Sequence, residues 1–362
     1  MNKLSRYLFS NLFQAVLSSL LVLVVLYGLF DTLFKGGDFI KESKYFFMTL
    51  QYMFIRIPVY VYQIAPIAVL IGAIIALTRL VRNNEYVVIL TSGVSLFKVV
   101  RILLGFSVIA GMLLALLGEY LVPPSEEITD HIIARSKVAN VNMLGKYNVW
   151  LKLDNEIIEL WEVLPDYTFK NILRYQLIDN KKLGYIKFSK MGEYEGSNTW
   201  RLKDVSTVTF QDREISSTIS NDEIWKPNFN LDLLNILVNK PKNMSVQNLQ
   251  QYINYLNKNH QKTIDYEVEM WKKIFYPSSL LVMVLIALIF TPIMGRHRNV
   301  GLKIILSLLV GFIYFFSIRF LGFFTQISNI NPIWFAALPT LIFVGVLITV
   351  LYCQDRGYMT RT

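Results

Sequence analysis

The chain has 362 residues, of which 54% are hydrophobic and only 17% charged, and its mean hydropathy is +0.41. Soluble domains carry about 25% charged residues, so this composition excludes the ordinary soluble class and favours an integral membrane protein. A net charge of +10 could indicate a nucleic-acid-binding protein, but the basic excess is scattered over loops beside apolar segments, and membrane topology explains it more simply.

Six apolar segments are long enough to cross a membrane as helices, which takes about 20 residues for a ~30 Å hydrocarbon core. The first follows Lys3 and Arg6, as a signal peptide would. It is longer than a signal h-region and no small-x-small cleavage site follows it, so we expect a retained helix. The six predicted spans are 8–30, 57–77, 99–122, 274–294, 304–324 and 332–353.

A short segment, "RNNEYVVILTSGVS" at 82–95, lies between the second and third spans. Asn83 or Asn84 suits a helix N-cap, Glu85 suits the positive end of the helix dipole, and Gly93 is a natural stop. The pattern predicts a helix of two turns at about 84–93. It is too short to cross the membrane, so we expect it to lie along the interface, as a re-entry turn or as a contact for a partner.

The placement of charge orients the chain, because short cytoplasmic loops collect Lys and Arg. With six spans both termini lie on one side, which they share with the loops 79–101 and 295–303. These parts hold eleven basic residues against two acidic ones, Glu85 and Asp355. The segment 125–265 is balanced, with 18 basic and 18 acidic residues. We therefore expect cytoplasmic termini and a large domain on the outer side.

The insert between the third and fourth spans has the pattern of an antiparallel β domain. In 148–163 and 183–210 apolar and polar residues alternate, and Gly196-Ser197-Asn198 is a predicted hairpin turn. A sandwich or jelly roll is favoured over an α/β domain. After Ser245, a predicted N-cap, a helical pattern leads toward the fourth span. The only cysteine, Cys353, lies at the end of the last span, so the domain cannot rely on an internal disulfide.

Motifs for chemistry are missing from the sequence. Gly145-Lys146 is the nearest fragment to a phosphate loop, and it lacks the upstream glycine and the following hydroxyl residue. No GxSxG or HExxH occurs. His131, His260 and His297 are too dispersed to predict a metal site with Cys353. The sequence therefore predicts a protein that is not an enzyme and holds no cofactor of its own.

Ionisable residues at the membrane are the remaining candidates, because a charge in hydrocarbon persists only if it is paired, wetted or used. Arg319 lies about 22 Å into the fifth span, near the outer headgroup level, and Asp31 ends the first span at a similar depth. They could form an ion pair, or Arg319 could snorkel to the interface or bind an anionic lipid head. Further bases that could bind lipid phosphate on this side are Lys35, Lys41, Lys44, Arg56, Arg135 and Lys137.

Five stretches carry a family resemblance: "APIAVLIGAIIALTRLVRNNEYVVILTSGVS" (65–95), "GEYLVPPSEE" (118–127), "VWLKLDNEIIEL" (149–160), "WKPNF" (225–229) and "YINYLNKNHQKTIDYEVEMWKKIFYP" (252–277). In this order they resemble the G-type permease subunits of lipopolysaccharide-export ABC transporters, and the resemblance spans essentially the whole chain. The sister F-type subunit, with the same layout, is the nearest alternative. A lipid-modifying membrane enzyme and a membrane scaffold or sensor with a periplasmic β domain are the rival classes.

The resemblance implies an inner-membrane permease that extracts lipopolysaccharide from the outer leaflet and passes it through a periplasmic jelly roll to a periplasmic bridge. It implies as partners a cytosolic ATPase dimer, which binds ATP and magnesium, a homologous F-type subunit and a single-helix accessory protein. It makes the short helix a coupling helix on the ATPase, with Glu85 at its head and Asn84 and Tyr86 beside it. It implies a lipid-contact region near the first span and just beyond the third, and with the depth of Arg319 the predicted bases for lipid A phosphates are Arg319, Lys35, Lys41, Arg135 and Lys137. The expected domains are 1–122, 123–270 and 271–362.

Overall fold

The computed structural model describes residues 3–35, 46–138, 146–153, 155–163, 168–178, 182–211, 214–227, 241–259, 261–293, 300–327 and 331–359. The chain forms two compact units. The helical unit comprises Met1–Thr129 and Glu267–Thr362, and the β unit comprises Asp130–Tyr266.

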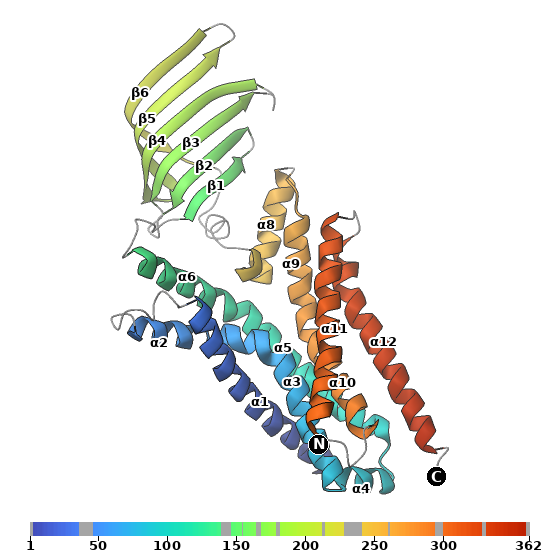
Figure 1. Ribbon diagram of the computed structural model, residues 1–362. Coiled ribbons are helices and arrows are strands. Elements are labelled where there is room, and N and C mark those ends of the chain that lie inside the picture. The colour runs from blue at the N-terminus through green and yellow to red at the C-terminus, as the bar shows by residue number, and fades with distance from the viewer. Residues whose placement is uncertain are drawn as a thin grey trace. The chain divides into compact units, whose positions relative to one another are not determined.

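Apolar helices build the helical unit, and Figure 1 shows α1 (Lys3–Lys35), α3 (Ile57–Arg82) and α5 (Leu96–Tyr120) running along it. Within the described residues six helical segments are long and apolar enough to cross a membrane, at Lys3–Phe34, Ile57–Arg82, Phe97–Asp130, Ile264–Phe290, Ile304–Thr325 and Pro332–Cys353. This confirms the six predicted spans. The helices are α1 (Lys3–Lys35), α2 (Phe46–Ile55), α3 (Ile57–Arg82), α4 (Glu85–Thr91), α5 (Leu96–Tyr120), α6 (Val122–Val138), α9 (Ile264–Phe275), α10 (Ser279–Ile293), α11 (Val300–Ile327) and α12 (Pro332–Met359), with a 3-10 turn η3 (Tyr276–Ser278).

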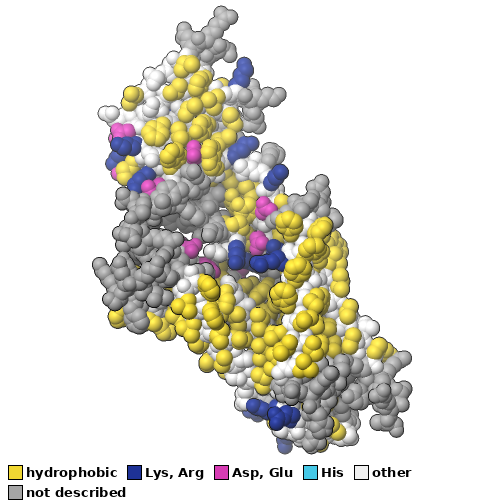
Figure 2. Space-filling model, in the orientation of Figure 1, with side chains coloured by type: hydrophobic (Ala, Val, Ile, Leu, Met, Phe, Trp, Pro, Cys, Tyr) yellow, Lys and Arg dark blue, Asp and Glu magenta, His cyan; other side chains and the backbone are white. Residues whose placement is uncertain are grey.

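The core of the helical unit lies around α3 and α10, whose apolar side chains are buried almost all round. The outer helices α1, α11 and α12 instead keep many large apolar side chains exposed, and Figure 2 shows hydrophobic side chains over much of the described helical surface. In water such a surface would be unfavourable, so it fits a protein whose flanks face lipid.

Helix α1 packs unusually closely on α3. A Cβ added at Gly72 would lie 2.5 Å from the Val16 Cα, so only glycine allows this approach. One turn away along α3, the Ser19 hydroxyl donates to the Ala68 carbonyl at 2.7 Å. A small residue and an interhelical hydrogen bond are the usual means by which membrane helices associate closely. We therefore treat α1 and α3 as one packed pair.

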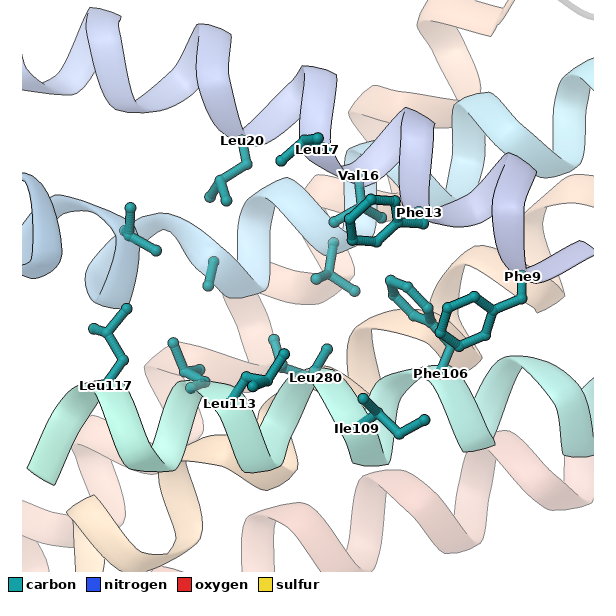
Figure 3. Close-up of a pocket in the computed structure, with 15 residues that line it drawn as sticks. Phe9, Phe13, Val16, Leu17, Leu20, Phe106, Ile109, Leu113, Leu117 and Leu280 are labelled. Carbon is teal, nitrogen blue, oxygen red and sulfur yellow. The ribbon is translucent and has the colours of Figure 1, made fainter. Parts of the chain in front are cut away.

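On another side α1 faces α5 across a cavity of about 400 Å³. Figure 3 shows the side chains of both helices pointing into the space between them. We call this cavity the α1–α5 groove. It is lined by Phe9, Phe13, Val16, Leu17, Leu20, Val61, Ala65, Val69, Phe106, Ile109, Ala110, Leu113, Leu114, Leu117 and Leu280.

The β unit contains one antiparallel sheet of six strands in the order β1 to β6, each paired with the next along the chain. The strands are β1 (Lys146–Leu153), β2 (Glu156–Val163), β3 (Phe169–Ile178), β4 (Lys182–Gly196), β5 (Thr199–Gln211) and β6 (Glu214–Trp225). Antiparallel pairing is confirmed. Among the described strands the topology is a meander in a single sheet, whereas a sandwich would divide them between two sheets.

The predicted hairpin turn is confirmed between β4 and β5. Gly196, Ser197 and Asn198 all have positive φ, at 95°, 49° and 58°. Positive φ at both central residues is the hairpin geometry that matches the twist of the flanking strands.

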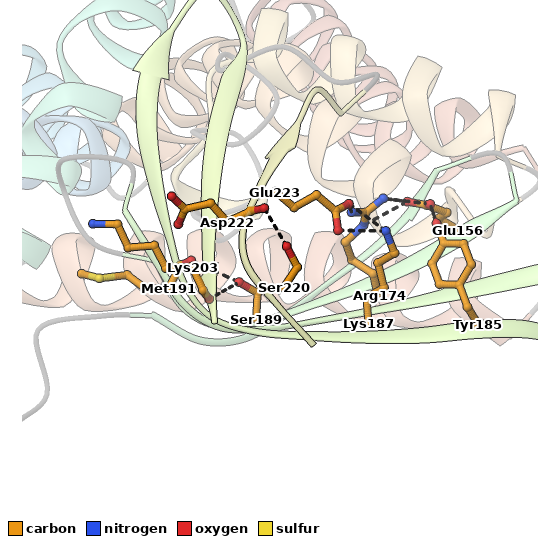
Figure 4. A network of polar contacts seen from close by, with 10 residues as sticks. All are labelled: Glu156, Arg174, Tyr185, Lys187, Ser189, Met191, Lys203, Ser220, Asp222 and Glu223. Carbon is orange, nitrogen blue, oxygen red and sulfur yellow. Dashed lines mark hydrogen bonds and ion pairs between the residues drawn. The ribbon is translucent and has the colours of Figure 1, made fainter. Parts of the chain in front are cut away.

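The sheet curls so strongly that its last strand contacts its third. Trp225 of β6 lies 6.4 Å from Phe169 of β3, ring centre to ring centre, although β4 and β5 separate the two strands. Beside these rings Arg174 of β3 bonds to Glu156 and to Glu223 of β6, as Figure 4 shows. The apolar core of the unit, which includes Trp200 and Leu160, fills the inner face of this curve.

Around this network Lys187 also pairs with Glu223, at 2.8 Å, and Tyr185 donates to Glu156. Burial and that hydrogen bond raise the pKa of Tyr185 to about 12, so its hydroxyl keeps the proton it donates.

The helix predicted after Ser245 is confirmed as α8 (Val246–Lys258), preceded by a short 3-10 turn η2 (Pro241–Asn243). The Ser245 side chain accepts from the Asn248 amide at 3.0 Å, as an N-cap does. The predicted face is buried, with Leu249, Tyr252, Ile253 and Leu256.

Candidate functional site

Helix α4 lies at the end of the helical unit where α1 begins (Figure 1). The Asn84 carbonyl accepts the first helical bond from the Val88 amide, and Gly93 follows the helix with a φ of 82°. The start near Asn84 and the stop at Gly93 agree with the sequence. Val87 and Val88 are 54% and 62% exposed, so α4 presents an apolar surface outward.

Glu85, the acid at the head of α4, accepts two hydrogen bonds. The Tyr7 hydroxyl of α1 donates to Oε2 at 2.6 Å, and the Asn83 amide donates to Oε1 at 3.2 Å. The carboxylate is half-buried. It therefore ties α4 to the first turns of α1, and a partner that moved Glu85 would act on α1 as well.

The two neighbours predicted beside Glu85 differ in position. Asn84 is exposed and has a left-handed φ of 61°, which asparagine tolerates better than most residues. Tyr86 packs against the helical core together with Ile89. The outward surface of α4 thus comes from Asn84, Val87 and Val88, while Tyr86 anchors the helix.

A buried ionic cluster lies at the opposite end of α1. Arg56, which is 4% exposed, forms a bidentate pair with Glu126 of α6, with both nitrogen–oxygen distances at 3.2 Å. Its Nε lies 3.3 Å from the Asp31 carboxylate of α1. The Asp31 and Glu126 side chains are 7% and 11% exposed. One guanidinium thus joins two carboxylates from two other helices in a nearly closed site.

Two tyrosines complete this Arg56 cluster. The hydroxyls of Tyr52 and Tyr60 donate to the same Asp31 oxygen at 2.9 and 3.0 Å. The Arg56 guanidinium lies 5.4 Å from the Tyr52 ring centre. Burial raises the pKa of Tyr52, so the hydroxyl remains a donor to the carboxylate. These donors spread the second negative charge, because two carboxylates face a single guanidinium.

The Arg56 cluster corrects two expectations from the sequence. The suggested ion pair between Arg319 and Asp31 is wrong, because Asp31 is paired with Arg56 and hydrogen-bonded to both tyrosines. Arg56 is also not available to a lipid phosphate, because it is buried and its NH1 and NH2 groups bond to Glu126. Helix packing, which a depth estimate does not include, decides the partner of Asp31.

Arg319 lies on the exposed side of α11, and no ion pair joins it to any residue that the structure describes. One turn further along α11, the Lys272 Nζ lies 3.1 Å from where a Gly322 Cβ would be. Lys272 is itself 2.9 Å from Glu269. Gly322 thus lets a second cation lie against the same stretch of α11, and no sequence pattern singles out Lys272.

The other predicted phosphate contacts lie outside what the structure describes. Lys35 ends α1, and Arg135 and Lys137 belong to α6, but only their backbone is described. Lys41 falls outside the described residues. In the described part of the chain no group of three or more His, Cys, Asp or Glu residues is arranged to hold a metal ion.

Tyr7 and Glu126 are the residues that sequence reasoning missed. Tyr7 lies 78 positions from Glu85, and Glu126 lies 70 positions from Arg56. The one available signal for Glu126 was its position in an acidic pair just beyond a span, "SEE" at 125–127, where a buried acid requires a buried base.

Residues 6–352 match the family model described as lipopolysaccharide export system permease LptF/LptG. The chain is similar to the lipopolysaccharide export system permease protein LptG of Escherichia coli strain K12, at 26% identity over 93% of this chain and 94% of that protein. It is also similar to the protein of the same name from Haemophilus influenzae, at 27% identity over 95% and 96%. Both relatives carry the G-type name, in agreement with the resemblance seen in the sequence.

A match of nearly the whole chain, six helices that can cross a membrane and an antiparallel β unit inserted between them are the features of a multi-pass inner-membrane permease. The chain belongs to the lipopolysaccharide export system permease LptF/LptG family.

Proposed function

We propose that this chain is the G-type subunit of the exporter and that α4 receives the movement of a cytosolic ATPase dimer, which binds the ATP and magnesium. The observation that carries the proposal is the hydrogen bond from Tyr7 to Glu85, beside the outward-facing Val87 and Val88. A short helix with an exposed apolar surface fits a partner's groove. Through its bond from Tyr7, Glu85 connects a partner bound to α4 with the first membrane helix, α1.

In the proposed orientation, both termini and α4 are cytoplasmic and the β unit is periplasmic. Support comes from the basic residues that flank α4, Arg79, Arg82, Lys98 and Arg101, because short cytoplasmic loops collect such residues.

The substrate enters from the outer leaflet into a cavity that a homologous F-type subunit completes, with a single-helix accessory protein joining the complex. Nucleotide binding and hydrolysis in the ATPase then collapse the cavity, and lipopolysaccharide passes by the β unit to a periplasmic bridge. Arg319 is the best-supported phosphate contact, because it is exposed and without an ion pair in the described part of the chain. Lys35, Lys41, Arg135 and Lys137 complete the proposed set.

Glu85→Ala tests the coupling step, with Tyr7→Phe as its matched control. Glu85→Ala removes both the partner contact and the bond to α1, whereas Tyr7→Phe removes only the bond. We expect recovery of the ATPase with the membrane subunits to fall about tenfold in Glu85→Ala, a loss of about 1.4 kcal/mol, because a charged contact at an interface is cut. Tyr7→Phe should keep normal recovery but transfer less lipopolysaccharide per ATP hydrolysed.

Recovery, ATPase activity and lipopolysaccharide release from proteoliposomes measure these effects. If recovery, ATPase activity and lipopolysaccharide release are all normal in Glu85→Ala, α4 does not have the proposed coupling role. Normal lipopolysaccharide transfer in Tyr7→Phe would contradict the proposed transmission from α4 to α1. It would not contradict the proposed contact between α4 and the ATPase.

A further inference from the structure

The α1–α5 groove is lined by hydrocarbon side chains only, and it is open along one side. Its rim residues Phe13, Leu17, Ile109 and Leu113 are 50%, 50%, 52% and 63% exposed. A cavity of about 400 Å³ falls within the roughly 300–1,000 Å³ usual for small-molecule sites. Its chemistry therefore suits an aliphatic chain that enters from the side.

The walls of the groove are held in place by contacts outside it. Gly72 against the Val16 backbone and Ser19 to Ala68 hold α1 on α3. At one end of the groove Phe9 and Phe106 meet edge to face, with ring centres 5.2 Å apart. Because α1 is held on α3, the groove cannot close simply by a shift of α1 toward α5.

The groove is as long as one leaflet is thick. On α1 its lining runs from Phe9 to Leu20, and on α5 from Phe106 to Leu117. Each stretch rises about 16 Å along its helix, close to half of the ~30 Å hydrocarbon core. One extended acyl chain therefore matches the groove in length.

A cation stands on the same stripe of α1, beyond the Phe9 end of the groove. Arg6 precedes Phe9, Phe13, Leu17 and Leu20 at a spacing of three, four, four and three residues, which keeps all five on one helix face. Arg6 is exposed, and no ion pair joins it to any residue in the described ranges. A phosphate at the interface above the groove would thus meet a guanidinium, which binds phosphate well.

We propose that the α1–α5 groove holds one acyl chain of an anionic phospholipid of the leaflet in which α1 begins, with the lipid phosphate on Arg6. A partner helix does not fit inside, because a cylinder of helix diameter and this volume is only about one turn long. The proposed orientation of the chain distinguishes this phospholipid from transported lipopolysaccharide, whose phosphates lie in the other leaflet. The site is for a resident lipid and is separate from the export path.

The test uses the full chain with its partner subunits in nanodiscs of phosphatidylethanolamine. The probe is phosphatidylglycerol, or phosphatidylcholine for comparison, with a diazirine on one acyl chain, and labelled peptides are identified by mass spectrometry. Labelling of 9–20 and 106–117 by phosphatidylglycerol should exceed labelling of the exposed α11 stretch 305–316. Equal or lower labelling of the groove would overturn the proposal.

Two variants, each with a control, test binding of the acyl chain and of the headgroup separately. Ala110→Phe fills the groove and should abolish its labelling, whereas Val108→Phe, on the other face of α5, should not. Arg6→Ala should lower the preference for phosphatidylglycerol over phosphatidylcholine about fivefold, equivalent to about 1 kcal/mol, and Arg6→Lys should retain most of it. Unchanged labelling in Ala110→Phe, or an unchanged preference in Arg6→Ala, would contradict the assignment.

Two other occupants would also overturn it. One is a partner's membrane helix, which would appear as a disulfide between Leu113→Cys and a cysteine placed in that helix. The other is lipopolysaccharide, which would appear as stronger labelling of the groove by a diazirine-bearing lipopolysaccharide than by phosphatidylglycerol.

Discussion

Arg56 in the helical unit and Arg174 in the β unit each join two carboxylates from two other elements, and each lies over an aromatic ring. Their surroundings differ. The acids of Arg56 are 7% and 11% exposed, and both pair with the same guanidinium. The acids of Arg174 are 23% and 27% exposed, and Lys187 supplies a second base to Glu223.

The same local arrangement therefore depends on its arginine to different degrees in the two units. A charge that loses its partner is costly when water cannot replace the partner. In the β unit water and Lys187 remain after Arg174 is removed. In the helical unit the nearly buried Asp31 would keep its bonds from the Tyr52 and Tyr60 hydroxyls, while the nearly buried Glu126 would lose its bidentate partner.

Arg56→Met is expected to have the largest effect on stability. Breaking a buried ion pair on one side costs about 3–5 kcal/mol, so the full chain in detergent should unfold at a much lower denaturant concentration. The triple variant Arg56→Met with Asp31→Asn and Glu126→Gln removes all three charges and should regain most of the loss. If the triple variant is no more stable than Arg56→Met, charge pairing is not what Arg56 contributes.

Arg174→Met should cost less, about 1–3 kcal/mol, because its acids are partly solvated and one keeps Lys187. Unfolding of the β unit, followed by tryptophan fluorescence of the full chain with Trp271 and Trp334 replaced by Phe, measures this loss. Adding Lys187→Met should increase it, because Glu223 then has neither base. A loss equal to that of Arg56→Met would erase the difference between the two clusters.

Arg319→Gln should change stability least, by less than about 0.5 kcal/mol, because the side chain is exposed and unpaired within the described residues. Its effect should instead be on the substrate. A photocrosslinker at position 319 should capture lipopolysaccharide, as should one at 35, whereas one at Phe312, two turns away and 71% exposed, should capture much less. Equal capture at 312 and 319 would show general lipid contact and no phosphate site.

Much of the local structure could be predicted because its causes are local. Hydropathy finds the spans, since the bilayer core sets their length. The turn at Ser197 and Asn198 needs positive φ at both residues, and the cap at Ser245 needs one oxygen near the first free amides. Glu85 could be placed at the head of α4 for the same reason.

The contacts between distant residues could not be predicted, because periodicity identifies a face but not what packs against it. The partner of Asp31 depends on where α3 lies along α1, which Gly72 and Ser19 decide. The curl that brings Glu223 to Arg174 is a property of the whole sheet, and the alternation within each strand would be the same in a flat one. Tyr7 likewise carries no local signal for its bond to Glu85, which lies 78 positions away.

Helix α1 carries a polar attachment near each end, with Tyr7 bonded to Glu85 and Asp31 bonded to Arg56. Twenty-four residues separate Tyr7 from Asp31, so the attachments lie about 36 Å apart along the axis, more than the ~30 Å hydrocarbon thickness. With α3 packed along its length, α1 is a stiff lever arm. If the α1–α3 pair tilts as one body at the α4 end, as the proposed coupling requires, the Asp31 end moves sideways without any change in the helix itself.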